Sequence, residues 1–326
     1  MKTKLIAGLL LGGLLVYFSI RGIDFRDVAK HLQGIHGGYL VPVLVLMVAM
    51  QWLRSVRWGI LLSPLEKVSQ LSLFSVSNVG FLAIVAIPAR LGELARPYLI
   101  TQHSRIAMSS ALGTIVVERV LDTLTVLLMA VFILMFTPAP SWMSRASGLL
   151  LFGTVSLTVL LVLTILFRGA LERKAEILLG RLPERYASGA LRLLHHFLDG
   201  FKAIADRGIV LRASVLSLVI WIVDALIIYL MFLSFRYQLP VSAAFVVMII
   251  LIVGIAIPAA PGFVGNWHYF CVLGLTLYGI SKPDALGFAI VYHFLSLAVL
   301  LVLGLACLPF HRFTLADLRR QMTQTR

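Results

Sequence analysis

The stretch AIVAIPARLGELARPYLI, residues 83–100, breaks an apolar segment with a proline and follows it with charged side chains. Pro88 lacks a backbone donor and clashes with the preceding helical turn, so a helix arriving from residue 70 is expected to end beside it. Backbone groups freed by such a break find no water in lipid and must face protein or a water-filled cavity. The break therefore predicts a hairpin inside a membrane protein.

The composition supports a chain that lies mostly in lipid. Of 326 residues, 60% are hydrophobic and 13% are charged, with a mean hydropathy of +0.99; soluble chains carry about 25% charged residues. The net charge of +14 fits loops facing anionic headgroups and needs no nucleic acid. Cys271 and Cys307 lie in apolar segments without metal-binding spacing, and no nucleotide loop is present. We expect no catalytic residue, metal or cofactor.

The apolar segments predict an all-α polytopic membrane protein. About 20 apolar residues cross a bilayer, and the candidate spans are 5–20, 39–62, 111–136, 146–167, 213–235 and 285–310. No cleavage site follows the first of these, which favours a retained span over a signal peptide. Two shorter segments, 70–87 and 241–257, end at a proline. The expectation is about six full spans and two broken or re-entrant hairpins.

The tetrapeptide AIPA recurs at 86–89 and 256–259, each time between an apolar run and a Gly- or Pro-containing turn. The basic segments 168–208 and 311–326 are expected in the cytoplasm. Counting spans from them gives the two halves opposite topology, as in transporters built from inverted repeats. Hairpins that cross the membrane fully would give the other spans the same orientation as re-entrant hairpins. The sequence therefore leaves both kinds of hairpin open.

These counts define one integral membrane domain over residues 1–310. Its first repeat is about 39–136 and its second about 213–310, joined through an amphipathic linker at 168–208. A basic cytoplasmic tail, 311–326, follows. The N- and C-termini are both expected on the cytoplasmic side.

Charged residues gather around the first break. Arg90, Glu93 and Arg96 are three apart and would pair with one another on a helix. Arginine suits a phosphate because its planar fork binds two oxygens. The segment is therefore a candidate headgroup site, with Pro88 and Gly92 as its hinge. The alternative is an ordinary loop whose arginines reach the cytoplasmic surface.

The following span carries VVERVLDTL, in which Glu118, Arg119 and Asp122 are costly in lipid without partners. One interpretation is a headgroup or proton-coupling site, and the other is a structural ion-pair network that locks this span to the hairpin. On the first interpretation, Arg90→Ala or Glu118→Gln abolishes translocation in a folded protein.

The second break, PAAPGFVGNWHYF, combines hinge residues with candidate ligand-binding side chains. The hinge residues are Pro258, Pro261, Gly262 and Gly265. A half-helix that starts there would aim its N–H groups at an anion, and Asn266 and His268 lie beside its start. Further polar residues within spans are secondary candidates: Arg54, Arg57, Asp224 and His293. For His293 an interhelical hydrogen bond is the simpler interpretation.

Four motifs together resemble a known family: RSVRW at 54–58, PARLGELARPYLI at 88–100, ERVLD at 118–122 and PAAPGFVG at 258–265. They are similar to the flippase-like membrane domain attached to bacterial lysylphosphatidylglycerol synthases, over about residues 5–310. The resemblance implies an inner-membrane protein that moves or binds polar-headed lipids. The matching positions are Arg90, Gly92, Glu93, Arg96, Glu118, Arg119, Asp122, Pro258, Pro261, Gly262 and Gly265.

Two departures from the family pattern matter. Asn266 and His268 stand where the family often has an acidic residue, which puts the charge preference for substrate in question. The soluble aminoacyl-transferase domain is missing from the sequence, so we do not expect this chain to synthesise lysyl-lipid.

Three functions follow as hypotheses. The first is a flippase-like transporter for an anionic or glycosylated lipid. The second is a scaffold for a lipid-modifying enzyme or glycosyltransferase. The third is an intramembrane transferase that uses Glu93, Glu118, Asp122 or His268 as acid or base. Membrane lipids are the expected partners, homo-oligomers are compatible with the sequence, and the bacterial inner membrane is the expected location.

Overall fold

The computed structural model describes residues 34–86, 92–136, 167–179, 183–256 and 260–310, with Tyr17 and short pieces between 148 and 164. All regular elements within these ranges are helices, which confirms the all-α class. The predicted span 5–20, Pro88, Arg90, Pro258 and the tail 311–326 lie outside the described residues, as does most of the predicted span 146–167.

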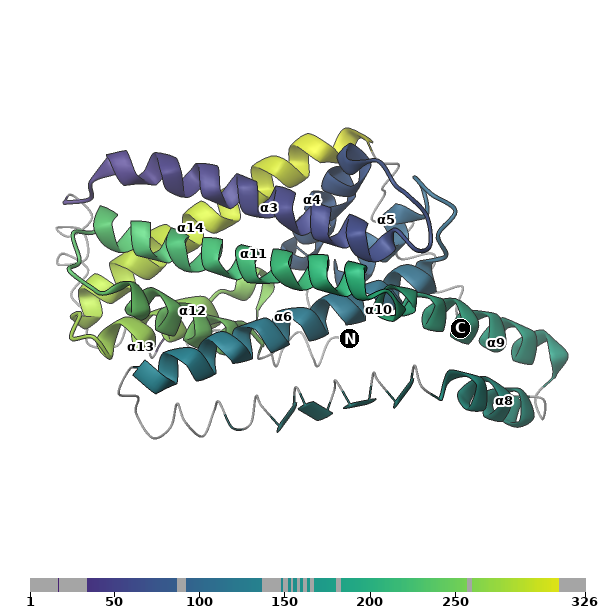
Figure 1. Cartoon of the computed structure of the whole chain (residues 1–326). Helices are drawn as coiled ribbons and strands as arrows, with labels where there is room; N and C mark the ends of the chain where they lie inside the picture. Colours follow the sequence, from purple (N-terminus) through teal and green to yellow (C-terminus); the bar gives the residue numbers. More distant parts are fainter. Residues whose placement is uncertain are drawn as a thin grey trace.

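Four long helices build the body of the molecule: α3 (Leu40–Leu62), α6 (Met108–Phe136), α11 (Arg207–Ser234) and α14 (Lys282–Cys307) (Figure 1). Each lies within a few residues of a predicted span. In the described part of the chain, three helical segments are long and apolar enough to cross a bilayer: Gly37–Leu62, Arg207–Ser234 and Lys282–Phe310. The total number of spans stays a prediction.

Two broken hairpins lie between the long helices. In the first, α4 (Gln70–Ala86) is followed by the short helix α5 (Ala95–Ile100). In the second, α12 (Val241–Ala256) leads through the 3-10 turn η3 (Pro261–Phe263) into α13 (Asn266–Thr276). Both α4 and α12 end at the first alanine of AIPA, at positions 170 apart. The repeated tetrapeptide therefore follows an apolar helix at equivalent positions of the two halves.

The two halves run in opposite directions. His36 N–H donates to the Ser234 carbonyl (2.8 Å), and Arg57 donates to the Ser217 hydroxyl (2.7 Å), so α3 and α11 are antiparallel. Each broken helix packs on the last helix of the other half, α4 on α14 and α12 on α6. The turn η3 also contacts α4. This reciprocal packing of each broken helix on the opposite half is the arrangement that an inverted repeat predicts. Figure 1 shows α4 and α12 among the long helices of the body.

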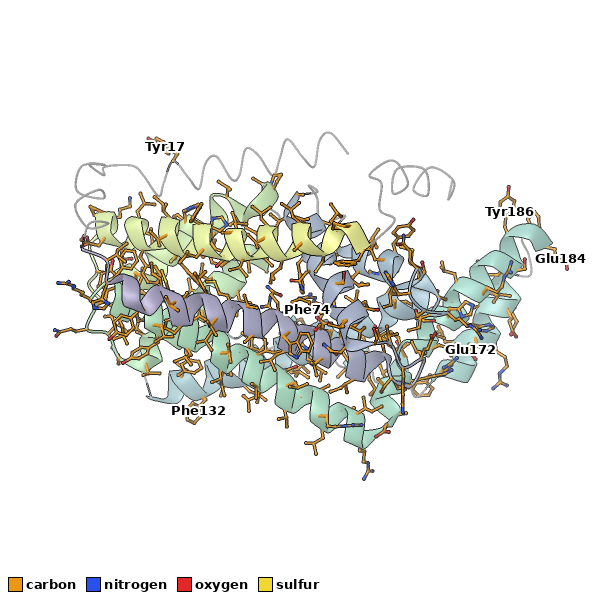
Figure 2. All side chains as sticks on the ribbon, turned by 90° about the horizontal axis from the view of Figure 1, so that it is seen from above. Tyr17, Phe74, Phe132, Glu172, Glu184 and Tyr186 are labelled. Atoms are coloured by element: carbon orange, nitrogen blue, oxygen red, sulfur yellow. The ribbon has the colours of Figure 1, made fainter. Side chains whose placement is uncertain are left out.

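The linker forms a separate hairpin of α8 (Arg168–Leu179) and α9 (Glu184–Asp199), followed by α10 (Lys202–Ala205). The outer part of this α8–α9 hairpin projects beyond the end of the helical body, with Glu184 and Tyr186 near its tip (Figures 1 and 2). Arg168 closes the base of the hairpin by donating to Asp199 (2.9 Å). Its cytoplasmic placement stays a prediction.

Candidate functional site

Four charged side chains from three helices form a buried ion cluster: Arg57 of α3, Arg96 of α5, and Glu118 and Asp122 of α6. Arg96 donates to both carboxylate oxygens of Glu118 (3.2 and 3.1 Å). Arg57 lies 3.2 Å from Glu118 and donates to both oxygens of Asp122, one of them at 3.1 Å. All four residues are at most 8% exposed. Two guanidinium groups thus face two carboxylates, and the cluster is electrically neutral.

Aromatic and hydroxyl side chains complete the surroundings of the cluster. The Arg96 guanidinium lies over the Trp58 ring at 4.3 Å, and over Phe81 at 5.3 Å. The Trp221 indole donates to Asp122 (3.1 Å). A neutral, hydrogen-bonded cluster of this kind fixes helices relative to one another, because breaking one pair leaves a buried charge. The observed cluster has the form of a structural ion-pair network between the hairpin and α6, which was one of the two interpretations of these charged residues in the sequence.

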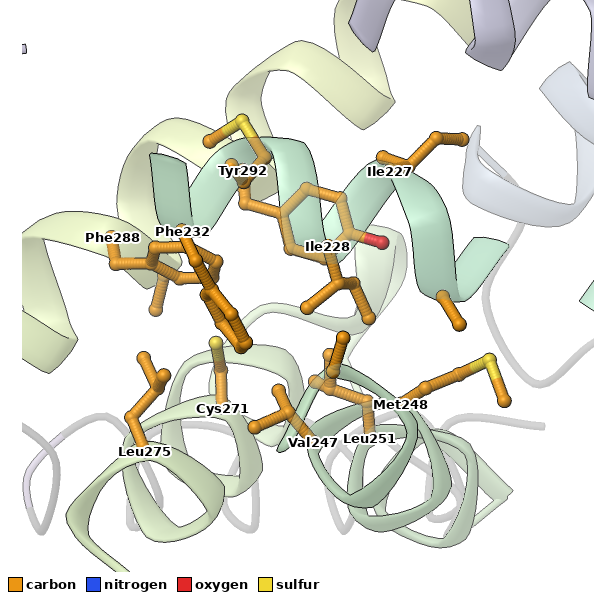
Figure 3. Packing of buried hydrophobic residues seen from close by; sticks show 14 of the residues in the cluster. Ile227, Ile228, Phe232, Val247, Met248, Leu251, Cys271, Leu275, Phe288 and Tyr292 are labelled. Atoms are coloured by element: carbon orange, nitrogen blue, oxygen red, sulfur yellow. The ribbon is translucent and has the colours of Figure 1, made fainter. Parts of the chain in front are cut away.

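The cluster exists in the first half alone among the described residues. The positions 170 residues after Arg57, Glu118 and Asp122 hold Ile227, Phe288 and Tyr292. These three belong to the largest apolar core, between α11, α12, α13 and α14 (Figure 3). In the second half, the positions equivalent to three of the four cluster residues are therefore filled by apolar packing in place of ion pairs.

Two glycines make room for the first hairpin. A Cβ on Gly80 would clash with Cγ of Arg96, and a Cβ on Gly92 would clash with the Ala83 carbonyl of α4. Gly92 was expected at the hinge, and it lies where the chain before α5 passes close to the backbone of α4. Sequence reasoning missed Gly80, because it lies inside the segment expected to be helical, away from the proline break, and its partner is 16 residues further along the chain.

Gly80→Ala is expected to displace Arg96 and to lower the free energy of unfolding by about 1–3 kcal/mol, the usual range for overpacking. Gly189→Ala is the matched control, since a Cβ there meets nothing within 4 Å. The control should leave stability unchanged or raise it slightly. Thermal unfolding in detergent measures both, and equal midpoints would contradict the packing argument.

A cavity of about 210 Å³ lies beside the ion cluster, between the two halves. Phe81 and Trp221 contact the cluster and also line the cavity, so they form the partition between the two. Side chains from both broken hairpins contribute to the wall, among them Val85, Phe263 and Trp267. Its polar lining consists mainly of Gln51, Arg54, Asp224, His293 and Ser296.

Arg54 and Asp224 are the charged residues of this lining. With the residues that the structure describes, neither makes a hydrogen bond or an ion pair, and Arg54 contacts the Phe81 ring at 5.7 Å. Two buried polar atoms of the lining, Gln51 Oε1 and Trp267 Nε1, also have no hydrogen-bond partner. Unpaired charge in an apolar setting is costly, so the cavity has unused capacity to bind a polar group.

The other predicted residues lie around these two features. Glu93 lies in the 3-10 turn at 92–94 that leads into α5, and Arg96 pairs with Glu118 of α6 instead of with Glu93. The expected pairing of Glu93 with Arg90 lies outside the described residues. Arg119 is half exposed, 3.9 Å from Glu118 and 3.8 Å from Asp122. The assignment of these residues and of the ion cluster to ligand binding stays a prediction.

In the second hairpin, Asn266 donates to the Gly254 carbonyl (2.9 Å) and joins α13 to α12. His293 of α14 hydrogen-bonds the Gly262 carbonyl (2.8 Å) and stacks on Trp267, with ring centroids 4.9 Å apart. His268 packs edge-on against His293 and is not part of the cavity lining. His293 therefore holds the turn of the second hairpin in place while contributing to the cavity wall.

Comparison with known proteins agrees with this architecture. The family model described as the lysylphosphatidylglycerol synthase TM region matches residues 5–304. A UPF0104 membrane protein of Methanothermobacter thermautotrophicus is 26% identical over 246 residues, which cover 70% of this chain and 72% of that protein. No solved structure matches the chain. The match over most of its length shows that the chain belongs to the family of the lysylphosphatidylglycerol synthase transmembrane region.

Proposed function

We propose that the chain is a flippase-like protein that binds the headgroup of a membrane lipid in the cavity and passes it between the leaflets. The observation that carries this proposal is the pair Arg54 and Asp224, which line a cavity walled by both broken hairpins and make no hydrogen bond or ion pair with the residues that the structure describes. Intramembrane charges without partners are expected to serve a ligand or an ion pathway.

The position of the cavity supports movement of a headgroup rather than static binding. Transporters with inverted repeats hold their substrate near the midplane, where interrupted helices of the two halves meet. Here α4 and α12 enter from opposite ends and the turn after α12 contacts α4. Rocking of one half against the other would open the cavity to each side in turn, while the acyl chains stay in the bilayer. In this proposal the protein lies in the inner membrane and performs no bond chemistry.

The test is translocation of a headgroup-labelled phospholipid in proteoliposomes. We expect the wild type to speed translocation over protein-free vesicles, and Arg54→Gln to slow it at least 10-fold. Arg192→Gln, an exposed change on α9 with the same loss of charge, is the control and should retain the wild-type rate. Equal rates for wild type and Arg54→Gln would reject the site, and no rate above protein-free vesicles would reject the function.

A scaffold function has one observation in its favour. Ile177, Leu178, Tyr186 and Leu193 are exposed apolar side chains of the α8–α9 hairpin, which projects from the body (Figure 2). On this hypothesis a soluble lipid-modifying enzyme binds the hairpin. Co-purification of such an enzyme, lost when the four side chains are replaced by serine, would support the scaffold hypothesis. That hypothesis does not predict slower lipid translocation in Arg54→Gln.

A further inference from the structure

The two charged residues of the cavity lining occupy equivalent positions of the repeat. Arg54 and Asp224 are 170 residues apart, the same offset that relates Ala86 to Ala256 at the ends of the broken helices. Gln51 and Trp221, which also line the cavity, share this offset. The cavity therefore lies between equivalent positions of α3 and α11, with the positively charged Arg54 on α3 and the negatively charged Asp224 on α11.

Arg54 and Asp224 are close enough for their charges to interact but are not within ion-pair distance. His36 bonds Ser234 and Arg57 bonds Ser217 across the antiparallel helices, which places Arg54 opposite positions 216–220 of α11. Asp224 is four to eight residues further along α11, an axial offset of about 6–12 Å at about 1.5 Å per residue. The cavity thus holds opposite charges at separated points along the direction in which the helices run.

A ligand that satisfies both side chains must carry both signs. An anionic headgroup would pair with Arg54 and leave the carboxylate of Asp224 facing a like charge, which is unfavourable. A neutral sugar would leave both charges without an ionic partner. A phosphate joined through a short carbon chain to an ammonium group supplies a partner for each. Arginine binds phosphate oxygens through its planar fork, while a carboxylate accepts hydrogen bonds from ammonium.

The size of the cavity also selects among headgroups. Sites for drug-sized ligands occupy about 300–1,000 Å³, whereas this cavity measures about 210 Å³. A small charged headgroup fits that space better than an oligosaccharide. The apolar residues that make up most of the wall exclude water and strengthen each ionic contact.

We propose that the cavity selects a zwitterionic phospholipid of the ethanolamine type, with Arg54 binding its phosphate and Asp224 its ammonium group. This inference rests on the proposed function for the site, and it names the substrate class of that site. Asp224 then determines specificity, since only the zwitterionic lipid gains from its carboxylate. Arg54 contributes to the binding of every phospholipid.

The inference is tested by native mass spectrometry of protein taken from bilayers with equal amounts of phosphatidylethanolamine and phosphatidylglycerol. The wild type is expected to retain the ethanolamine lipid at least 5-fold over the glycerol lipid. Asp224→Asn should reduce this ratio at least 5-fold, and Arg54→Gln should reduce retention of both lipids. Glu184→Gln, an exposed acid-to-amide change on α9, should behave as wild type. Equal retention of the two lipids by wild type, or an unchanged ratio in Asp224→Asn, would overturn the inference.

A second arm separates a lipid from a soluble ligand of the same chemistry. Glycerophosphoethanolamine at millimolar concentration should leave the retained lipid in place, because it lacks the acyl chains that hold the ligand in the bilayer. Full displacement would overturn the assignment to a lipid. Selective retention without translocation would instead reject the transport function and leave the headgroup assignment standing. Translocation with an unchanged lipid ratio in Asp224→Asn would reject the headgroup assignment and leave the transport function standing.

Discussion

Glu118→Gln is expected to lower the free energy of unfolding by about 3–5 kcal/mol, the usual cost of breaking a buried ion pair from one side. Glu118 accepts two hydrogen bonds from Arg96 and lies 3.2 Å from Arg57, with 1% of its surface exposed. Glutamine keeps the shape and removes the charge, so both guanidinium groups lose their shared carboxylate. Chemical or thermal unfolding in detergent micelles measures the loss.

The charge-neutral double variant Arg96→Met with Glu118→Leu is the informative control for this prediction. Buried ion pairs replaced by apolar side chains of similar volume often keep or gain stability, and Arg57 would still pair with Asp122. We expect the double variant to recover most of the loss. A Glu118→Gln protein as stable as wild type would show that the cluster does not hold α5 and α6 together.

Ser296→Phe is expected to slow lipid translocation at least 10-fold while the protein keeps its fold. Ser296 lies on α14 and lines the cavity, so a phenyl ring there would occupy the space proposed for the headgroup. Because the ring fills an existing void rather than a packed core, the stability cost should be small. The proteoliposome rate and the unfolding midpoint measure the two effects separately.

The control for the blocked cavity is Val302→Phe, on the same helix but 65% exposed. It adds a phenyl ring in the apolar environment without entering the cavity. Both variants should unfold at similar temperatures, and only Ser296→Phe should lose transport. Similar transport by the two would mean that the headgroup does not pass through this cavity.

Much of the fold could be predicted from the sequence, for two reasons. A segment in lipid must satisfy its own backbone hydrogen bonds and is therefore helical, and its side chains face hydrocarbon, so the segment is recognised as one apolar run. The predicted segments 70–87 and 241–257 correspond to α4 and α12 almost to the residue. Proline and glycine marked both breaks, and the AIPA repeat located their equivalence. The four long helices followed from length and hydropathy alone.

The site was harder to predict, because its residues meet only through the packing of the two halves. Spacing along the chain favoured the group at 90–96 and 118–122, whereas the side chain that completes the cluster is Arg57 of another helix. Arg54 and Asp224 were only secondary candidates. Their equivalence within the repeat was present in the numbering, but their position on one cavity required the antiparallel contact of α3 with α11.

The most direct test of the account compares translocation by Arg54→Gln with translocation by the charge-neutral variant Arg96→Met with Glu118→Leu, at equal amounts of folded protein. If the cavity binds the ligand and the ion cluster has a structural role, Arg54→Gln loses at least 10-fold in rate and the double variant stays within about 2-fold of wild type. Full transport by Arg54→Gln with no transport by the double variant would contradict this assignment and place the headgroup at the ion cluster.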